Sequence, residues 1–434
     1  MNIKNSYLIF AIMSFSAMSV KADVWTLDHT VKKAVEVSNQ VAIESLNAEM
    51  SGLDAVSAEK GWYPSVSVST RANIISELME IEMPFKTIRF GDYDTYDFCL
   101  RFNQLLYDGG RLKALREASL DRAAMSSYRS EAVRLGVEYQ AKTAFWRIVM
   151  TGQTLKAAQH SIIEAQNHLK DVNARYKEGM VLENDVLRAR LRVSQAEMDM
   201  ISRNTGLESA RAAFRKLVAL DHDEEVTVEW NDEYSSGTIS PELEKAVELR
   251  PEFRVFDAAL AVSEKSARQA QADIRPAVGF FGAFNYGKPG LDLPANEWMH
   301  YFSGGVMVNW NIWDWGTSSR NVEKAMITRK QTMKKREDFI RELTNQLTDT
   351  VAECNEAQKR EILAQQAAEY AERQLEQINV SYREGIVTET DYDNAHAVYT
   401  RAILEKSVSS IVLRLHEAKI EFILGIAYNG GDNE

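Results

Sequence analysis

The sequence lacks the residues and motifs on which disulfide frameworks, metal sites and most enzymes depend. Its 434 residues contain two cysteines, Cys99 and Cys354, which are too few for a framework of bridges. The seven histidines show neither the two-histidine spacing of a helical zinc site nor a neighbouring Cys-x-x-Cys. No phosphate loop and no Gly-x-Ser-x-Gly turn occurs. We therefore expect no metal, no cofactor and no catalytic residues, and the protein is not predicted to be an enzyme.

Positive charge and long apolar runs are also scarce. Lys and Arg number 51 against 63 Asp and Glu, a net charge of −12, which disfavours a nucleic-acid partner. The first 22 residues have the pattern of a secretory signal, with Lys4, an apolar stretch from Tyr7 to Met18 and expected cleavage after Ala22. No later run of about 20 apolar residues exists, so no membrane-spanning helix is predicted.

Proline is absent from two long runs, from Gly110 to Tyr176 and from Gly316 to Tyr382. Each run contains 67 residues, which would extend roughly 100 Å as a helix. Apolar residues, many of them alanine, recur at steps of three and four in both runs, as in a coiled-coil seam. The seam residues are Leu155, Ala158, Ile162, Ala165, Leu169 and Val172, and in the second run Ala364, Ala368, Ala371, Leu375 and Ile378. The period resumes after Gly179 and after Gly385, which predicts two helical hairpins with tips at 176–185 and 382–391.

The chain is a duplication. Tyr176-Lys177-Glu178-Gly179 returns as Tyr382-Arg383-Glu384-Gly385, and Tyr107-Asp108-Gly109-Gly110 returns at the same shift as Trp313-Asp314-Trp315-Gly316. We interpret 23–220 as the first structural repeat, 221–240 as an acidic linker, 241–427 as the second repeat and 428–434 as a polar tail. The interval between Pro64 and Asp108 is longer than its second copy, which predicts an exposed loop there.

Four stretches alternate with period two and are predicted to be strands. They lie at about 65–75, 96–107, 277–287 and 301–313, in two hairpins with loops near 76–95 and 288–300. Each has one apolar and one polar face, and aromatic residues gather at the strand ends, as in a membrane β-barrel. The alternative is a soluble four-stranded sheet packed on helices. Four strands cannot close in lipid, so the membrane interpretation requires three chains and a 12-stranded barrel.

The residues resemble the TolC family of outer-membrane efflux and secretion channels along essentially the whole mature chain. The resemblance rests on Trp25-Thr26-Leu27 with Lys33-Ala34-Val35, on Tyr63-Pro64, on Tyr107-Asp108-Gly109-Gly110-Arg111, on a Tyr-x-x-Gly-x-x-x-x-x-Asp motif in both halves, and on Leu424-Gly425. It implies a mainly α-helical homotrimer in the outer membrane of a Gram-negative-type cell. A 12-stranded barrel would stand in outer-membrane lipid, and a long α-helical barrel would project into the periplasm. Segment 221–240 and the C-terminal tail would contribute to an equatorial girdle.

The hairpin tips are the candidate partner-binding sites. In the family the tips meet a periplasmic adaptor, which implies a role for Tyr176, Gly179, Met180, Val181, Leu182, Tyr382, Gly385, Ile386 and Val387. The alternative is structural: the two glycines would be helix C-caps that need positive φ, and the apolar residues would staple the turn. Both roles are compatible.

The resemblance also implies a gate. A family aspartate matching Asp185 bonds a tyrosine matching Tyr382 in a neighbouring tip, and a ring of aspartates matching Asp391 lines the entrance. Thr388-x-x-Asp391 independently predicts a capping box. This chain departs from the family pattern, because Val387 stands where a gating arginine can occur and Asn394 stands where a second ring aspartate can occur.

These features together predict a passive exit duct of a tripartite efflux pump or a type I secretion system. An inner-membrane pump or ABC exporter would supply the energy, and the duct would carry small molecules or protein. Two other functions are the alternatives. A secreted or periplasmic coiled-coil structural or adhesive protein would have no pore, and a periplasmic enzyme would need a clustered polar site that the sequence does not show.

Overall fold

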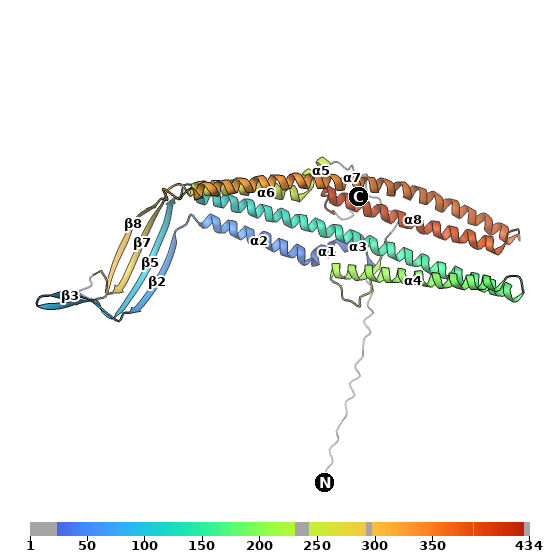
Figure 1. Cartoon of the computed structure of the whole chain (residues 1–434), viewed down its shortest axis with the longest axis horizontal. Helices are drawn as coiled ribbons and strands as arrows, with labels where there is room; N and C mark the ends of the chain where they lie inside the picture. Colours follow the sequence, from blue (N-terminus) through green and yellow to red (C-terminus); the bar gives the residue numbers. More distant parts are fainter. Residues whose placement is uncertain (1–23, 231–242, 292–296, 385, 429–434) are drawn as a thin grey trace, which may run out of the picture.

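The structure is a computed structural model that describes residues 24–230, 243–291, 297–384 and 386–428. The predicted signal peptide, the second half of the acidic linker, Gly385 and nearly all of the polar tail lie outside the described residues. The described chain is elongated, with a four-stranded sheet at one end and helices running away from it (Figure 1).

Within the described residues, the two halves of the chain repeat the same elements in the same order, except that β3 and β4 have no counterpart in the second half. The elements of the first half are β1 (Val24–Trp25), α1 (Leu27–Val37), α2 (Asn39–Lys60), β2 (Ser65–Ile74), β3 (Met79–Met83), β4 (Lys86–Phe90), β5 (Asp94–Tyr107), α3 (Arg111–Lys177) and α4 (Glu183–Val218). Those of the second half are β6 (Thr227–Val228), α5 (Leu243–Leu249), α6 (Pro251–Ala272), β7 (Ala277–Lys288), β8 (Met299–Asn309), α7 (Thr317–Arg383) and α8 (Glu389–Leu424).

Two very long helices form the body of the molecule. Helices α3 and α7 have 67 residues each, which corresponds to about 100 Å. Each turns back at its tip into a helix of 36 residues, α4 or α8. The predicted alanine seam is buried at Ala158, Ala165, Ala364, Ala368 and Ala371. Alanine there lets paired helices approach closely over many turns. No helix within the described ranges is long and apolar enough to cross a membrane.

Aspartates at the strand-to-helix junctions set where the long helices begin. The Asp108 carboxylate accepts hydrogen bonds from the backbone N–H groups of Gly110 (3.0 Å) and Leu112 (2.6 Å). Asp314 does the same for Gly316 (3.0 Å) and Ser318 (2.7 Å). The capped N–H groups would otherwise be unpaired at the helix N-terminus. Gly110 (φ 93°) lies in the left-handed region that favours glycine, which explains this residue at the junction.

The four long strands form one antiparallel sheet with the order β2-β5-β7-β8. Pairing of β5 with β7 joins the hairpin of the first half to that of the second. The register places Val68, Leu100 and Phe284 on one face, opposite one another across three strands. Ser69, Cys99 and Asn285 occupy the other face in the same way. The predicted apolar and polar faces are therefore confirmed.

Two sequence predictions about the strands were wrong. Strand β8 ends at Asn309 and does not reach residue 313. Its partner β7 begins at Ala277, opposite Asn309, so residues beyond Asn309 have no strand to pair with in the protomer. The interval 76–95 is not a simple loop, because β3 and β4 form a further antiparallel hairpin that extends beyond the sheet (Figure 1). Cys99 is a buried free cysteine, and Cys354 is a free cysteine that is partly buried.

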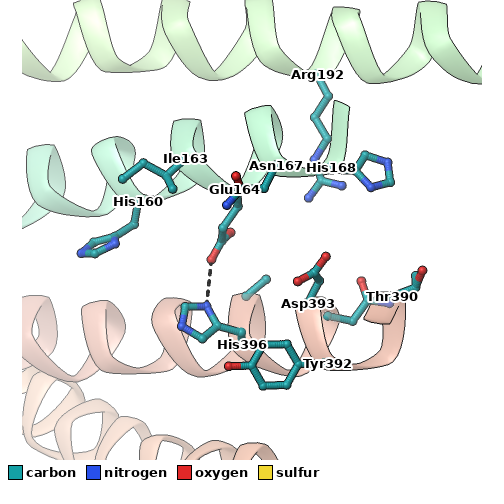
Figure 2. A pocket seen from close by; sticks show the side chains of 12 residues that line it. His160, Ile163, Glu164, Asn167, His168, Arg192, Thr390, Tyr392, Asp393 and His396 are labelled. Carbon is teal, nitrogen blue, oxygen red and sulfur yellow. Dashed lines mark hydrogen bonds and ion pairs between the residues drawn. The ribbon is translucent and has the colours of Figure 1, made fainter. Parts of the chain in front are cut away.

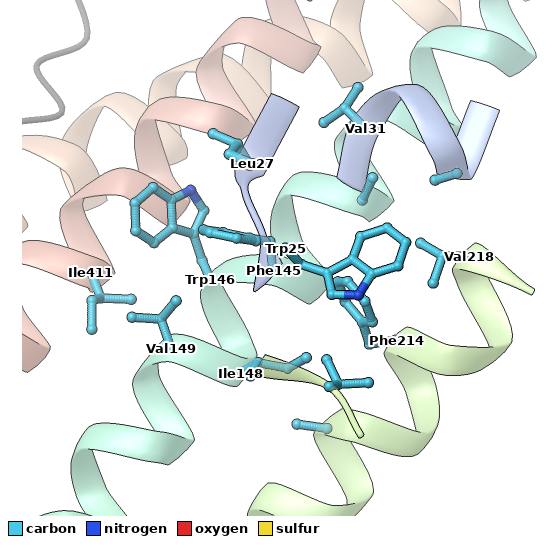
Figure 3. Packing of buried hydrophobic residues seen from close by; sticks show 14 of the residues in the cluster. Trp25, Leu27, Val31, Phe145, Trp146, Ile148, Val149, Phe214, Val218 and Ile411 are labelled. Atoms are coloured by element: carbon cyan, nitrogen blue, oxygen red, sulfur yellow. The ribbon is translucent and has the colours of Figure 1, made fainter. Parts of the chain in front are cut away.

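The largest apolar core lies midway along the helices, where the chain start meets α3 and α4. Strand β1 pairs in parallel with β6, and Trp25 packs edge-on against Phe214 with ring centroids 5.3 Å apart. Phe145 and Val218 are buried in the same cluster (Figure 3). The first part of the acidic linker thus contributes β6 to this middle region, next to the helices.

Buried polar contacts tie the end of α8 to α3 in the same region. The Lys142 ammonium donates to Glu421 at 2.6 Å, and Glu138 accepts a hydrogen bond from Tyr428 N at 3.0 Å. Both α3 side chains are buried. Buried charged groups require partners, so these contacts fix the position of the second half of the chain against α3 near the middle of the molecule.

The junction caps predict a stability effect. Asp108 is 5% exposed, and alanine there would leave the buried Leu112 N–H and the partly buried Gly110 N–H without this acceptor. We expect Asp108→Ala to lower the free energy of unfolding by about 1 to 2 kcal/mol, measured as a lower midpoint of thermal unfolding in detergent. Asp108→Asn keeps one acceptor oxygen and should cost less. Equal midpoints for wild type and Asp108→Ala would contradict the capping role.

Candidate functional site at the hairpin tips

Both hairpin tips have the same backbone closure. At the first tip, Met180 N donates to Arg175 O at 2.9 Å, and Gly179 has a φ of 73°. At the second, Ile386 N donates to Ser381 O at 2.9 Å. This six-residue closure is the Schellman geometry, in which a left-handed residue, usually glycine, ends a helix. Gly179 therefore has a structural role; Gly385 lies outside the described residues.

The apolar tip residues divide into packed and exposed ones. Val181 packs against Val172 and Val186 and staples the first turn. In contrast, Met180, Leu182 and Ile386 are 71%, 75% and 71% exposed. Exposed apolar side chains at the ends of two hairpins gain nothing from water, and the partner contact predicted for the tips stays a prediction.

The remaining candidates at the tips follow the same division. Tyr176 is 45% exposed beside the first turn. Val387 is half-buried and occupies the repeat position of Val181 in the second tip. The exposed tip residues are therefore Tyr176, Met180, Leu182, Tyr382 and Ile386, whereas the two valines are half-buried.

The two predicted gate aspartates each begin a return helix. Asp391 accepts hydrogen bonds from Thr388 N (3.0 Å) and from the Thr388 hydroxyl (2.6 Å), and Asp391 N donates back to Thr388 Oγ1 (3.3 Å), which is the predicted capping box. Asp185 caps α4 less completely, by accepting from Leu182 N at 3.0 Å, because leucine cannot return the bond.

The Thr388 contacts also set the ionisation of Asp391. Hydrogen bonds from the Thr388 hydroxyl, and then from its backbone N–H, hold the pKa of Asp391 below its ordinary value. A carboxylate with a lowered folded pKa stabilises the fold at all pH values above its ordinary pKa, and the contribution disappears as the pH falls through the lowered one. Asp391 therefore stays charged across the neutral and mildly acidic range.

Within the protomer, Asp185 and Tyr382 have separate contacts. The Asp185 carboxylate lies 3.7 Å from the Arg188 guanidinium, and the Tyr382 ring stacks on Tyr392 with centroids 5.4 Å apart. The predicted bond between Asp185 and Tyr382 would join neighbouring tips and needs a second hairpin in register. The protomer leaves Tyr382 at the surface, 38% exposed.

A cleft of about 280 Å³ lies between the two hairpins, next to the tips on the side of the sheet. Asn394, one of the predicted gate residues, lines this cleft. Its walls come from α3, α4 and α8, and most of its lining groups are polar or charged (Figure 2). The lining includes His160, Glu164, His168, Arg192, Asp393, Asn394 and His396. In the described part of the chain, no group of three or more His, Cys, Asp or Glu side chains is arranged to hold a metal ion.

One contact crosses this cleft. His396 Nδ1 on α8 lies 3.3 Å from Glu164 Oε1 on α3 (Figure 2). Sequence analysis missed this pair because the two residues are 232 positions apart. The spacing of His160, Glu164 and His168 at steps of four shows that they share one helix face, but the sequence gives no sign of which helix that face meets.

The comparisons with known proteins agree with this architecture. Residues 33–220 and 243–407 match the family described as "Outer membrane efflux protein". The Campylobacter jejuni CmeC outer membrane channel has a similar fold, with a TM-score of 0.77 and 15% identity over 92% of this chain and 85% of that one. The outer membrane protein VceC from Vibrio cholerae is also similar, with a TM-score of 0.72 and 15% identity over 92% of this chain and 96% of that one.

A membrane protein from Pseudomonas aeruginosa has a TM-score of 0.77 and 16% identity, over 92% of this chain and 90% of that chain. Among curated proteins, none matches. At these low identities the structural similarity establishes the fold, which agrees with the predicted mainly α-helical chain carrying four barrel strands.

The capping box predicts a local effect at the second tip. Thr388→Ala should speed hydrogen exchange in the first turn of α8, residues 389–392, about fivefold, since an N-cap threonine contributes about 1 kcal/mol to its helix. It should also raise the pKa of Asp391 toward its ordinary value. Leu182→Ala is the matched control, because Leu182 occupies the same repeat position without a capping side chain and should leave exchange in α4 unchanged. Equal effects of the two substitutions would contradict this assignment.

Proposed function

Because the chain belongs to the outer membrane efflux protein family, we propose that three copies form the outer-membrane exit duct of a tripartite efflux pump or a type I secretion system. The family is one of passive outer-membrane channels, so the protein acts in efflux at the outer membrane and is not an enzyme. Each protomer has two long sides, called margins here, and one margin of a copy can pair with the opposite margin of the next copy. This complementarity is the observation that best supports the trimer.

The sheet has one open edge on each margin. Strands β2 and β8 are the outermost of the four strands, and each pairs on one side alone within the described residues. Unpaired N–H and C=O groups cannot remain in lipid. Pairing of β8 of one protomer with β2 of the next satisfies both edges, and three protomers then supply the strands of a 12-stranded barrel.

The helices continue the same two margins. Near the sheet the packing order is α2, α3, α6 and α7, and near the tips it is α4, α3, α8 and α7. Helices α2 and α4 therefore lie along one margin and α7 along the other (Figure 1). A head-to-tail contact of this kind closes into a ring when a whole number of copies, each rotated by the same angle, completes a full turn.

Exposed apolar residues lie along all three marginal helices, and on α2 and α4 they recur as stripes at coiled-coil steps. They are Ile43, Leu46, Met50 and Leu53 on α2, Leu187, Leu191, Met198 and Ile201 on α4, and Ile327, Met333, Leu363, Tyr370 and Val380 on α7. Such stripes have the spacing of a coiled-coil seam but have no partner in the protomer. They fit a contact between α2 or α4 of one copy and α7 of the next.

The apolar face of the sheet supports its place in lipid. Val68, Phe302 and Val306 are 60%, 79% and 63% exposed on that face. An apolar surface of this extent is unfavourable in water, whereas contact with lipid chains removes it from water. Aromatic rings stack at the far ends of the strands, with Trp298 between Tyr96 and Tyr286, which fits the aromatic girdle of a membrane barrel. This face weighs against the secreted coiled-coil alternative without a pore.

At the opposite end, the tips would bind a periplasmic adaptor. The exposed Met180, Leu182 and Ile386 offer flexible apolar contacts beside Tyr176. An inner-membrane pump or an ABC exporter would supply the energy, because the duct itself only opens and closes. Small molecules or exported protein would pass through, and the partners would decide which.

The gate would be formed at the tips of the trimer. In this proposal Asp185 bonds Tyr382 of an adjacent hairpin, and three copies of Asp391 narrow the entrance with negative charge. Val387 and Asn394 replace an arginine and an aspartate that can occur in the family, so the closing network contains fewer ionic contacts. The resting gate should therefore depend more on packing, including the stack of Tyr382 on Tyr392.

The trimer predicts the outcome of a charge substitution in the α4 stripe. Leu191→Glu combined with Met198→Glu would place two charges in each of three seams, so the trimer should dissociate. Gln195→Glu adds charge to an adjacent, exposed face of α4 and should leave the trimer intact. Light scattering on protein extracted from the outer membrane with detergent gives the mass. A trimeric double variant, or a wild-type monomer in the soluble fraction, would contradict the proposed duct.

A further inference from the structure

The cleft between the two hairpins contains an ionisable contact that the gate described above does not use. His396 Nδ1 approaches Glu164 Oε1 at 3.3 Å, from α8 of the second hairpin to α3 of the first (Figure 2). His396 lies seven residues after the start of α8, which is about 10 Å from the tip. Separation of the hairpins at the tips would break this contact.

We propose that His396 and Glu164 form a proton-operated latch between the two hairpins of one protomer, which closes in acid and makes tip opening sensitive to periplasmic pH. The inference rests on the proposed function as a gated duct. It adds a regulatory contact within the protomer to the gate contacts between neighbouring tips.

The two side chains are placed so that protons can reach them. The His396 and Glu164 side chains are 43% and 29% exposed, at the wall of a cleft open to solvent. Histidine changes charge within the range from about pH 5 to about pH 8. An imidazolium donates Nδ1–H to a carboxylate as a charged hydrogen bond, and the ionic part of that attraction disappears when the ring becomes neutral.

The direction of the effect follows from this change of charge. When the imidazole ring at position 396 is an imidazolium and Glu164 a carboxylate, α3 and α8 attract each other across the cleft. A neutral ring lacks this ionic attraction, so the hairpins then separate more easily. Asp391 does not compete as the sensor, because its hydrogen bonds with Thr388 keep its pKa below the ordinary value and the group stays ionised through this range.

The other charged groups around the cleft shape this response. From α3, His160 and His168 flank Glu164 one helical turn away on either side. Asp393 of α8 lies across the cleft from His168 and Arg192 (Figure 2). A charged His160 ring would have the same sign as an imidazolium at position 396 and would oppose the latch, so His160→Gln should enhance the response.

Groups from the remaining two helices complete the surroundings. Arg192 of α4 lines the cleft and keeps its charge at every relevant pH. Helix α7 presents the Tyr382 ring to Tyr392, which in turn lies 6.3 Å from the His396 ring. The charges of Arg373 and Glu369 on α7 pair with each other at the surface. Among the described residues of α8, His396 is thus the ionisable group that contacts a carboxylate of α3 across the cleft.

The latch is testable by single-channel recording with the tips exposed to one bath. The trimer is inserted into a planar lipid bilayer, and the bath on the tip side is set to about pH 5.5 or about pH 8. For wild type the open probability should be lower in acid, by about 1.5- to 5-fold for each latch, since partly exposed ion pairs are weak. His396→Gln should abolish the difference, and His396→Arg should give the acid behaviour at both pH values.

His416 on the same helix supplies a matched control. His416 Nδ1 lies 3.4 Å from Glu353, but this contact joins α7 and α8 within one hairpin. His416→Gln should therefore keep the wild-type pH response. A pH response that persists in His396→Gln, or disappears in His416→Gln, would overturn the latch.

A distance measurement separates failure of the latch from failure of the duct. Spin labels at Glu178→Cys and Glu384→Cys, in a Cys99→Ala and Cys354→Ala background, report the separation of the two tips of a labelled chain diluted into unlabelled trimers. The separation should be shorter and more uniform in acid, and His396→Gln should remove the change. Absence of conductance at every pH would overturn the proposed duct, whereas unchanged distances between the two pH values would overturn the latch.

Discussion

The constraint on which this structure depends is that backbone N–H and C=O groups cannot stay unpaired in lipid. A single chain has four strands with two open edges, β2 and β8, so it cannot stand in a membrane alone. Away from the sheet, the same two margins continue along the helices, with α2 and α4 on one side and α7 on the other. One head-to-tail contact, repeated three times, can therefore close the barrel and the helical tube together.

Rigidity and mobility are distributed along the length of the protomer. The buried Asp108 cap near the sheet and the apolar core around Trp25 and Phe214 hold the sheet end and the middle of the protomer. Near the tips the two hairpins are separated by a cleft, and the contact between them includes the partly exposed pair of His396 and Glu164. Regions with few buried contacts open at low free energy. Opening at the tips can therefore occur while the remainder of the tube stays assembled.

Local features were predictable from the sequence, and features that depend on helix docking were not. The lengths of the long helices followed from proline-free runs and periodicity, and the capping box from Thr388 and Asp391, which are three residues apart. The hairpin β3–β4 was missed because a length difference signals an insertion but not its structure. The end of β8 depends on where β7 begins. The pairing of His396 with Glu164 depends on how two hairpins dock, which no single segment encodes.

An electron cryo-microscopy map of the detergent-extracted assembly would test the central claim most directly, at a resolution that separates strands about 4.8 Å apart. The account predicts three chains around one axis and twelve strands, with β8 of each protomer hydrogen-bonded to β2 of the next and α7 packed against the next α2 and α4. A different number of chains, or β2 and β8 left unpaired, would contradict it.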